Sequence, residues 1–162
     1  MIRKATGADL EKIKDIYAAA RRFMAENGNP TQWGDGYPSE KIIKTDMENG
    51  DLYVVSDGND IHGVFAFIIG DDPSYREIDG SWLSEEEYGT VHRIASDGKM
   101  KGIFSSAMSF CEEKIKHLRI DTHPDNKAMQ KAIEKHCFEK RGIIIYRPDG
   151  SPRIAYEKNP VD

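Results

Sequence analysis

Residues 93–106 read Arg-Ile-Ala-Ser-Asp-Gly-Lys-Met-Lys-Gly-Ile-Phe-Ser-Ser. This pattern predicts a strand that runs into a tight loop, and a helix that begins directly after the loop. The first turn of a helix offers backbone N–H groups and a partial positive charge, so it attracts anions. Gly98 and Gly102 allow close approach to the backbone, and Lys99 and Lys101 add charge. The stretch suits a pyrophosphate group, although a Gly/Lys loop before a helix is more often an ordinary turn.

The spacing of these glycines and lysines differs from that of two phosphate-binding motifs. It is neither the G-x-x-x-x-G-K-S/T pattern of a P-loop nor the G-x-G-x-x-G pattern of a dinucleotide-binding fold. The flanking segments are more informative. A strand at Thr90–Ser96, a helix from Ile103 to Ile115 and a strand at Leu118–Thr122 form a β-α-β passage. Such a crossover makes its two strands parallel.

Regular patterns continue toward the N-terminus. Apolar residues at helical spacing predict a helix from Leu10 to Met24, with Asp9 as its N-cap and Asn27-Gly28 after its end. The other elements predicted on this side are a strand at Ile2–Ala5, a short helix capped by Ser39 and closed by Asn49-Gly50, and two strands, Asp51–Ser56 and Ile61–Gly70, joined by a turn at 57–60. The apolar run of the last strand predicts cover on both of its faces.

The C-terminal part alternates between strands and one more helix. This helix begins after Asn126, and strands at Gly142–Tyr146 and Ile154–Glu157 follow it. Residues 71–89 read as irregular and acidic. The element order is β-α-α-β-β-β-β-α-β-α-β-β. It predicts an α/β protein, with helices on the faces of a mixed (α+β) sheet, in a single domain over residues 1–162.

The composition restricts the class of protein. The chain of 162 residues carries 28 acidic and 23 basic residues, and its net charge of -5 argues against a simple nucleic-acid binder. The longest apolar run, 64–69, is far shorter than a membrane span, and the N-terminus lacks the apolar stretch of a secretory signal. Cys111 and Cys137 show no ligand-like spacing. We therefore expect no metal, no disulfide framework, no membrane partner and a cytoplasmic location.

These features together resemble the GNAT superfamily of N-acetyltransferases, and the resemblance covers nearly the whole chain. The element order is that of the family. Four passages agree with it: Ile2–Ala5 with Asp9-Leu10 at the opening, Lys99–Phe104 where the family has its pyrophosphate loop (Arg/Gln-x-x-Gly-x-Gly/Ala), Asp121–Met129 at the strand-to-helix segment with the family's Asn, and Cys137-Phe138 in place of Gly-Phe.

The resemblance implies a site for acetyl-CoA in a gap where the strand Arg93–Ser96 splays from the strand Leu118–Thr122. Asn126 would reach the cofactor from the next helix, or cap that helix, and the two roles are compatible. The residues implied to hold acetyl-CoA are Ile94, Ala95, Ser96, Lys99, Met100, Lys101, Gly102, Ile103, Phe104, Asn126 and Met129.

Four residues depart from the family pattern, and one of them is Cys137, which replaces Gly. Lys99 replaces Arg/Gln and keeps a donor. Phe104 replaces a small residue, so it either crowds the cofactor or packs into the core. Ile133 stands near the family's helix tyrosine and has no proton to donate. Phe104 and Ile133 motivate a second hypothesis, a non-catalytic acyl-CoA-binding or regulatory module. A plain interaction domain is the third.

The implied reaction transfers an acetyl group to a primary amine of a small molecule, an amino acid or a peptide, by direct attack in a ternary complex. A base helps, because such an amine is mostly protonated at neutral pH. His92 is the first candidate for the base, Glu87 the second, and Tyr88 is a candidate proton donor. Against these roles, a strand histidine is often a packed residue, and consecutive glutamates usually face solvent. Strand alternation predicts His92 and Ile94 on one face and Arg93 on the other.

Aromatic residues in the irregular segments are candidates for the acceptor site. They are Trp33, Tyr37, Tyr75 and Trp82, which either line that site or pack under their loops. Acidic residues near them, Asp71, Asp72 and Glu85–Glu87, favour a cationic acceptor. The sequence does not identify the acceptor, and it leaves a homodimer open.

Overall fold

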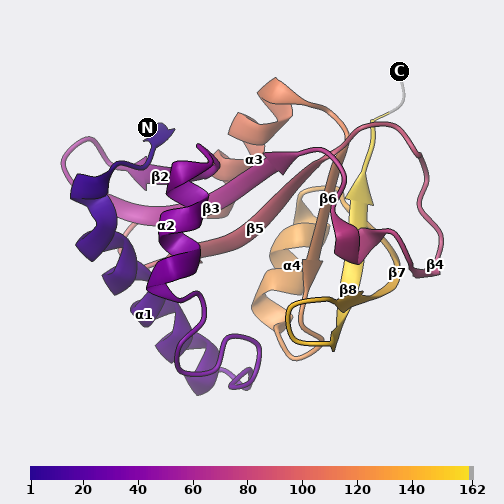
Figure 1. Ribbon diagram of the computed structural model, residues 1–162, viewed down its shortest axis with the longest axis horizontal. Coiled ribbons are helices and arrows are strands. Elements are labelled where there is room, and N and C mark those ends of the chain that lie inside the picture. The colour runs from indigo at the N-terminus through magenta and orange to yellow at the C-terminus, as the bar shows by residue number, and fades with distance from the viewer. Residues whose placement is uncertain (161–162) are drawn as a thin grey trace. The chain divides into compact units, whose positions relative to one another are not determined.

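Eight β-strands and four α-helices follow one another along residues 1–160, the part of the chain that the computed structural model describes (Figure 1). Their order confirms the predicted one. The strands are β1 (Ile2–Lys4), β2 (Leu52–Ser56), β3 (Ile61–Ile69), β4 (Asp79–Gly80), β5 (Gly89–Ser96), β6 (Leu118–Thr122), β7 (Glu139–Tyr146) and β8 (Ser151–Lys158). The helices are α1 (Leu10–Glu26), α2 (Glu40–Glu48), α3 (Ile103–Lys114) and α4 (Lys127–Lys135), with short 3-10 turns η1 (Gly7–Asp9) and η2 (Pro73–Tyr75). No helix within residues 1–160 has the length and apolar character that a membrane span requires.

The strands belong to one mixed sheet with the hydrogen-bonded order β1-β2-β3-β5-β6-β8-β7-β4. β5 and β6 run parallel, with Gly89 opposite Leu118 and Thr90 opposite Arg119. This pairing confirms the predicted crossover. Antiparallel pairs join β1 to β2, β2 to β3, β4 to β7, β6 to β8 and β7 to β8. A splay of β5 from β6 beyond the paired residues stays a prediction.

The contacts divide the chain into two compact units. The first unit holds Met1–Phe67 and His92–Phe110, and the second holds Ile68–Val91 and the chain from Cys111 onward. Strands β3 and β5 and helix α3 each contribute residues to both units.

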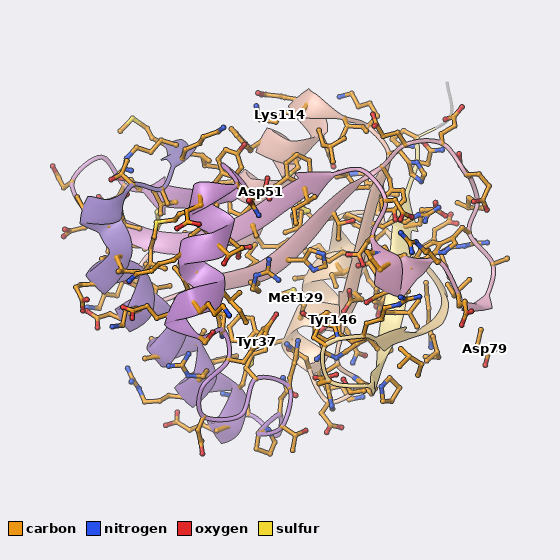
Figure 2. The ribbon with its side chains drawn as sticks, in the orientation of Figure 1. Tyr37, Asp51, Asp79, Lys114, Met129 and Tyr146 are labelled. Carbon is orange, nitrogen blue, oxygen red and sulfur yellow. The ribbon has the colours of Figure 1, made fainter. Side chains whose placement is uncertain are left out.

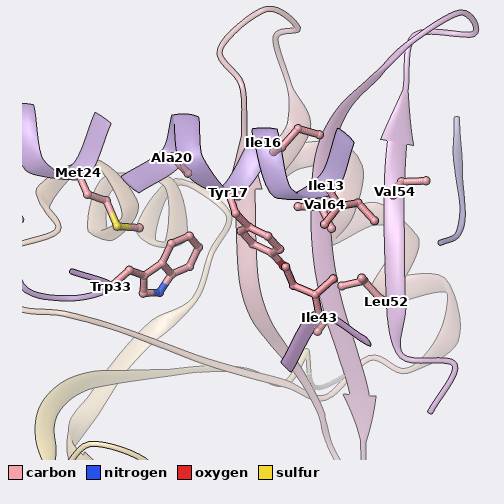
Figure 3. Packing of buried hydrophobic residues seen from close by; sticks show 12 residues of the cluster. Ile13, Ile16, Tyr17, Ala20, Met24, Trp33, Ile43, Leu52, Val54 and Val64 are labelled. Atoms are coloured by element: carbon pink, nitrogen blue, oxygen red, sulfur yellow. The ribbon is translucent and has the colours of Figure 1, made fainter. Parts of the chain in front are cut away.

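Helices α1 and α2 pack onto one face of β2 and β3 in the first unit (Figure 3). The apolar residues of α1 recur every three or four positions, so they form one stripe along the helix. Removing this stripe from water is what holds the helix on the sheet. The side chains of this core come from α1, α2, the loop between them, β2, β3 and β5: Ile13, Ile16, Tyr17, Ala20, Met24, Trp33, Ile43, Leu52, Val54, Val64, Ala66 and Ala95.

The other face of β2 and β3 packs against the first part of α3. Tyr53 stacks on Phe65 with ring centroids 5.5 Å apart, and Phe110 of α3 lies 4.9 Å from Tyr53. A Cβ at Gly63 would lie 2.7 Å from the side chain of Ile103, so the glycine allows α3 to approach β3 closely. Because strand residues alternate in direction, cover on both faces accounts for the apolar run of β3 and confirms that prediction.

The second unit builds its own core around β7 and β8. Tyr75, Tyr88, Ile144 and Ala155 form a buried cluster, with Trp82 packed against its edge. On α4 the side chain of Ile133 is fully buried. The residue that stands near the family's helix tyrosine is therefore a core residue.

Asp9 does not cap α1 as the sequence suggested. It directly precedes the helix, but its side chain makes no capping bond to α1. Its Oδ2 instead lies 2.7 Å from Nη1 of Arg3 and accepts a hydrogen bond from the backbone N–H of Thr6 at 2.8 Å. These contacts close the turn η1 and lower the pKa of Asp9 to about 2, chiefly through the bond to Arg3. The cap predictions at Ser39 and Asn126 are confirmed, since their side chains accept from Ile42 N and Met129 N.

Several predicted strands are longer in the structure. β7 begins at Glu139, because Glu139 and Lys140 pair with Glu157 and Tyr156 of β8. β8 begins at Ser151, because the pairing continues to Tyr146 and Ser151 beside the connecting turn. The segment predicted to be irregular, 71–89, contains η2 and the two-residue strand β4, which pairs with Gly142 and Ile143 of β7. η2 and β4 are too short to show a hydrophobic period, so the sequence pattern does not predict them.

Candidate functional site

The loop 97–102 joins β5 to α3 in the first unit and has a defined backbone. Ser96 Oγ accepts a hydrogen bond from Gly98 N at 3.0 Å, and Asp97 Oδ1 accepts one from Lys99 N at 2.9 Å. Gly98 and Gly102 have φ values of 81° and 76°, in the left-handed region that favours glycine. Sequence and geometry agree here, because the two glycines permit the turn that begins the helix.

Positive charge gathers at this turn. Lys99 and Lys101 are exposed, and nothing lies within 4 Å of where a Cβ would stand at Gly98 or Gly102. The loop leads into the first turn of α3, which begins at Ile103. Helix N-terminus, accessible glycine backbone and two ammonium groups together make a surface suited to an anion.

Asp97 fixes this loop to the start of β3. Its backbone N–H donates to His62 O at 3.0 Å, and its Oδ2 lies 2.8 Å from Nδ1 of His62. Nε2 of His62 lies 3.1 Å from Oδ2 of Asp57 in the β2–β3 turn. The two carboxylates raise the pKa of His62, with the bond to Asp97 as the largest cause. The loop 97–102 is therefore anchored by a histidine side chain that contacts two carboxylates.

Strand β5 departs from regular geometry at Arg93. Its φ of 52° is left-handed, so the predicted alternation of side chains does not continue through this residue. Two bonds of 2.8 Å join its guanidinium to the carboxylate of Asp46 on α2, and its carbonyl accepts from Tyr17 Oη at 2.8 Å. These buried partners hold the backbone of Arg93 in its left-handed conformation and compensate for the steric cost. Ala95, two residues on, packs into the first core.

The predicted catalytic residues have different environments. His92 is half-buried on β5, whereas Glu87 is exposed just before the strand. Tyr88 is 7% exposed, its hydroxyl accepts from Asp72 N at 2.7 Å, and burial raises its pKa. Its ring lies 4.0 Å from the guanidinium carbon of Arg119. These contacts favour a structural role for Tyr88 and leave His92 and Glu87 as candidates for the base.

The aromatic residues of the first unit separate into core and surface positions. Trp33 is 8% exposed and packs edge-on against Tyr17 at 5.6 Å, beneath α1 (Figure 3). Its burial favours the packing alternative. Tyr37, labelled in Figure 2, is half-buried, and its hydroxyl lies 3.4 Å from Nη1 of Arg93. Tyr37 therefore reaches the irregular point of β5.

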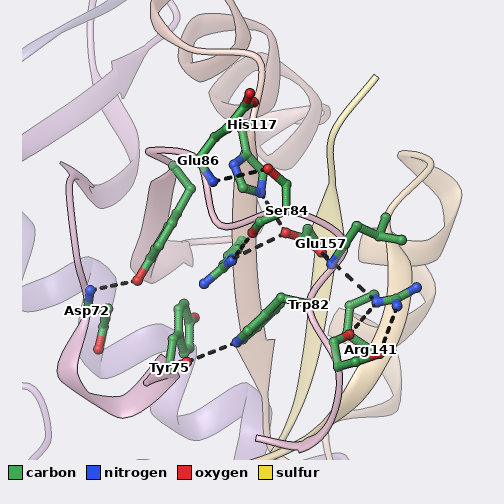
Figure 4. Close-up of polar contacts among 12 residues, drawn as sticks. Asp72, Tyr75, Trp82, Ser84, Glu86, His117, Arg141 and Glu157 are labelled. Carbon is green, nitrogen blue, oxygen red and sulfur yellow. Dashed lines mark hydrogen bonds and ion pairs between the residues drawn. The ribbon is translucent and has the colours of Figure 1, made fainter. Parts of the chain in front are cut away.

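The aromatic residues of the second unit line an open cavity of about 820 Å³. Tyr75 is 1% exposed and donates to Asp121 Oδ2 at 2.6 Å, so only part of it faces the cavity. Trp82 is half-buried and donates from Nε1 to Tyr75 O at 2.9 Å (Figure 4). The acidic residues of the lining are Asp71, Glu77, Glu85, Glu86 and Glu87, and its basic residues are Arg76 and Arg119.

Arg119 is buried beside this cavity in a network of opposite charge. Its guanidinium carbon lies 3.9 Å from the centroid of the Trp82 ring, and Nη2 donates to Ser84 O at 2.6 Å. Nε donates to Oε2 of Glu157, which is fully buried and also lies 2.6 Å from Nε2 of His117 (Figure 4). The charge of Arg119 is thereby balanced within the protein, and Arg76 pairs with Asp71 at 2.7 Å. The remaining carboxylates of the lining, those of Glu77, Glu85, Glu86 and Glu87, set the charge of the cavity.

Solved acetyltransferase structures share this fold over nearly their whole length. A GNAT-family acetyltransferase from Streptococcus agalactiae 2603 matches with a TM-score of 0.88 and 30% identity, over 100% of this chain and 96% of that one. A candidate acetyltransferase from Staphylococcus aureus Mu50 matches at 0.71 and 24%, over 98% of both chains. A GNAT-family acetyltransferase from Listeria monocytogenes 4b F2365 matches at 0.68 and 22%, over 99% and 94%. No family model and no curated protein matches the sequence.

The chain belongs to the GNAT family of acetyltransferases. It is an acyl-CoA-dependent N-acetyltransferase, and enzymes of this family generally use acetyl-CoA. The residues of the loop 97–102 fit the diphosphate of such a co-substrate, because they offer accessible backbone at two glycines and two ammonium groups at a helix N-terminus. Among residues 1–160, no group of three or more His, Cys, Asp or Glu side chains is arranged to hold a metal ion.

The sequence did not predict the roles of two groups of residues in this GNAT protein. His62 showed no motif, yet it anchors the loop 97–102 through Asp97. Asp46 and Tyr17 showed only helical spacing, yet they hold Arg93 in its left-handed conformation. The available signal was weak: a histidine on a strand that is otherwise apolar. Asn126 and Met129 lie in the second unit, where Asn126 caps α4, and their contact with a co-substrate stays a prediction.

Proposed function

We propose that this GNAT enzyme transfers the acetyl group of acetyl-CoA to a primary amine of a small molecule, an amino acid or a peptide. The loop 97–102 is the observation that carries the proposal. Its left-handed glycines, exposed lysines and the N-terminus of α3 form one anion-binding surface within a single unit. Ile94, Ala95 and Ser96 precede this loop on β5, where their backbone groups are proposed to bind the pantetheine arm.

The proposed chemistry is direct attack in a ternary complex. The amine nitrogen attacks the thioester carbonyl carbon, the new C–N bond forms, and the C–S bond breaks as CoA leaves as a thiolate. We assign removal of the amine proton to His92 on β5, with Glu87 as the alternative. A thiol ionises near ~8.5, so the thiolate needs little help from an acid. An isoleucine at position 133 is therefore compatible with turnover.

The acceptor is proposed to be a cation. The cavity in the second unit combines the half-buried ring of Trp82 with five carboxylates. Arg119 is neutralised by Glu157 and Arg76 by Asp71, so four carboxylates are left to attract a cation. An acidic aromatic cavity attracts ammonium groups and disfavours carboxylates. We therefore expect amines that carry a second positive charge to be better acceptors than amines that carry a hydroxyl in its place.

Two measurements test the proposal. Calorimetry is expected to show saturable acetyl-CoA binding, and no binding at millimolar acetyl-CoA contradicts the assigned loop. Release of free thiol is then followed across a set of amines, in which a diamine is compared with the amino alcohol of the same length. The diamine is expected to have the higher kcat/KM. Equal values for the pair contradict the cationic acceptor while leaving the acetyl-CoA assignment intact.

A further inference from the structure

His62 occupies an unusual place for a side chain outside the proposed chemistry. It lies at the start of β3, is 8% exposed, and has an acidic partner on each ring nitrogen. Asp97, at the start of the loop 97–102, is 2.8 Å from Nδ1, and Asp57, in the β2–β3 turn, is 3.1 Å from Nε2. Lys12 of α1 is a further charged residue whose field reaches Asp97.

The link from His62 continues into the loop. One carboxylate oxygen of Asp97 binds His62, and the other accepts from the backbone N–H of Lys99 at 2.9 Å. The backbone N–H of Asp97 donates to His62 O. Asp97 is thus fixed by His62 on one side and shapes the turn at Lys99 on the other. A change at His62 therefore reaches the turn at Lys99 through a single residue, Asp97.

We infer that His62 is a positioning residue for acetyl-CoA binding, and that it acts through Asp97 on the backbone of the loop 97–102. This inference rests on the proposed role of that loop. Binding an anion with backbone N–H groups requires those groups to be held in place beforehand, because each loop residue ordered on binding costs conformational entropy. His62, which belongs to the first unit, holds the backbone of this loop in place through Asp97.

The two sides of the imidazole are not equivalent. The side chain of Asp97 is 9% exposed and that of Asp57 is 43% exposed. A buried carboxylate loses more than an exposed one when its donor is removed, since water replaces the donor only at the exposed group. The Nδ1 side therefore matters for the loop, and the Nε2 side contributes mainly through orientation of the ring.

This asymmetry allows a matched pair of substitutions. In His62→Asn the amide nitrogen stands near the place of Nδ1 and can still donate to Asp97. In His62→Gln the longer side chain brings its amide near the place of Nε2 and toward Asp57 instead. Both substitutions remove the imidazole and its charge, and they differ in which carboxylate keeps a donor.

We expect the dissociation constant of coenzyme A, measured by calorimetry at pH 7, to rise about tenfold in His62→Gln and to stay within about threefold of wild type in His62→Asn. The KM for acetyl-CoA follows the same order, while kcat changes less than about twofold, because the reacting groups are untouched. The free energy of unfolding is measured for both. A purely structural role would lower stability without separating the two variants in affinity.

Asp97→Asn gives an independent variant should His62→Gln fail to fold. Its amide oxygen can still accept from Lys99 N, whereas its uncharged amide N–H takes the place of the carboxylate oxygen at Nδ1 of His62. The charge-assisted bond in which His62 donates to position 97 is therefore lost, and the affinity for coenzyme A falls. Wild-type affinity in His62→Gln or in Asp97→Asn overturns the inference, and so does equal weakening of His62→Asn and His62→Gln. If the wild-type enzyme itself does not bind coenzyme A, the proposed function fails, and this inference fails with it.

Discussion

Individual side chains of this enzyme hold backbone conformations that are costly by themselves. Arg93 has left-handed geometry in the middle of a strand, and a bidentate ion pair with Asp46 compensates for it. Cys137 also has left-handed geometry, with φ of 68°, but it is exposed at the end of α4. The two residues differ, because only the conformation of Arg93 is secured by buried polar partners.

Cys137→Gly is expected to stabilise the protein. Cys137 follows the C-cap of α4, a position that favours glycine, and its Cβ is strained at positive φ. Removing that strain should raise the free energy of unfolding by about 1 kcal/mol, measured by denaturant unfolding. Cys137→Ala is the control, since it removes the thiol and keeps the Cβ. An equal gain in the alanine variant would contradict the conformational explanation.

The contribution of His62 to stability is expected to depend on pH. Its pKa is raised in the folded state by Asp97 and Asp57, so the folded protein binds the proton more tightly than the unfolded chain does. The stabilisation is complete below the unfolded value of about 6.5 and declines as pH rises through the higher folded value. The difference in unfolding free energy between wild type and His62→Asn, followed from pH 6 to 9, should therefore shrink. A constant difference contradicts this coupling.

His92→Ala is expected to lower kcat about 100-fold at pH 7 and distinctly less at pH 9, if His92 is the general base. At the higher pH a larger fraction of the amine is already neutral, so less depends on the base. Initial rates of thiol release across this range provide the test. A profile parallel to wild type excludes His92, and a pH-dependent loss in Glu87→Gln in its place assigns the base to Glu87.

At the scale of elements, the junction from β5 to α3 could be read from the sequence. Apolar spacing marks the helix, glycines mark the turn, and both signals are local in the chain. The short strand β4 and the full length of β7 could not be read in this way. They depend on pairing between residues that are distant in sequence, such as Asp79 and Ile143.

The double variant Lys101→Glu with Gly102→Asp tests the charge of the loop. Two carboxylates at the helix N-terminus proposed to bind the diphosphate should weaken coenzyme A binding at least about 30-fold, measured by calorimetry. Gly102 has positive φ, so part of any loss is steric. Lys101→Gln with Gly102→Asn is the control, because it has the same shape without the negative charge. Equal losses in the two double variants would remove the electrostatic role of the loop.

At the scale of the whole molecule, we propose that residues 1–162 form one cooperative domain. The chain passes between its two contact units within strands β3 and β5 and within helix α3, so neither unit can unfold without breaking a regular element. Each unit contains one tryptophan, Trp33 in the first and Trp82 in the second. These residues can report on the two units separately.

Single-tryptophan proteins are expected to unfold together. In Trp82→Phe the fluorescence follows Trp33 and the first unit, and in Trp33→Phe it follows Trp82 and the second. For each variant the fluorescence and far-UV circular dichroism midpoints in urea should coincide, as expected of a two-state transition. A fluorescence transition that precedes loss of circular dichroism in either variant would show that the two units unfold independently.

The sequence by itself determined most of the elements, most of their caps and the turn at residues 97–102, because periodicity, turn residues and capping are properties of neighbouring residues. Only the tertiary structure decided that Trp33 is a core residue, that Arg93 binds Asp46 from 47 positions away, and that His62 meets Asp97 across 35 positions. Such contacts depend on which elements pack together, and no local pattern records them. The same loop that the sequence identified is therefore anchored by a histidine that only the fold revealed.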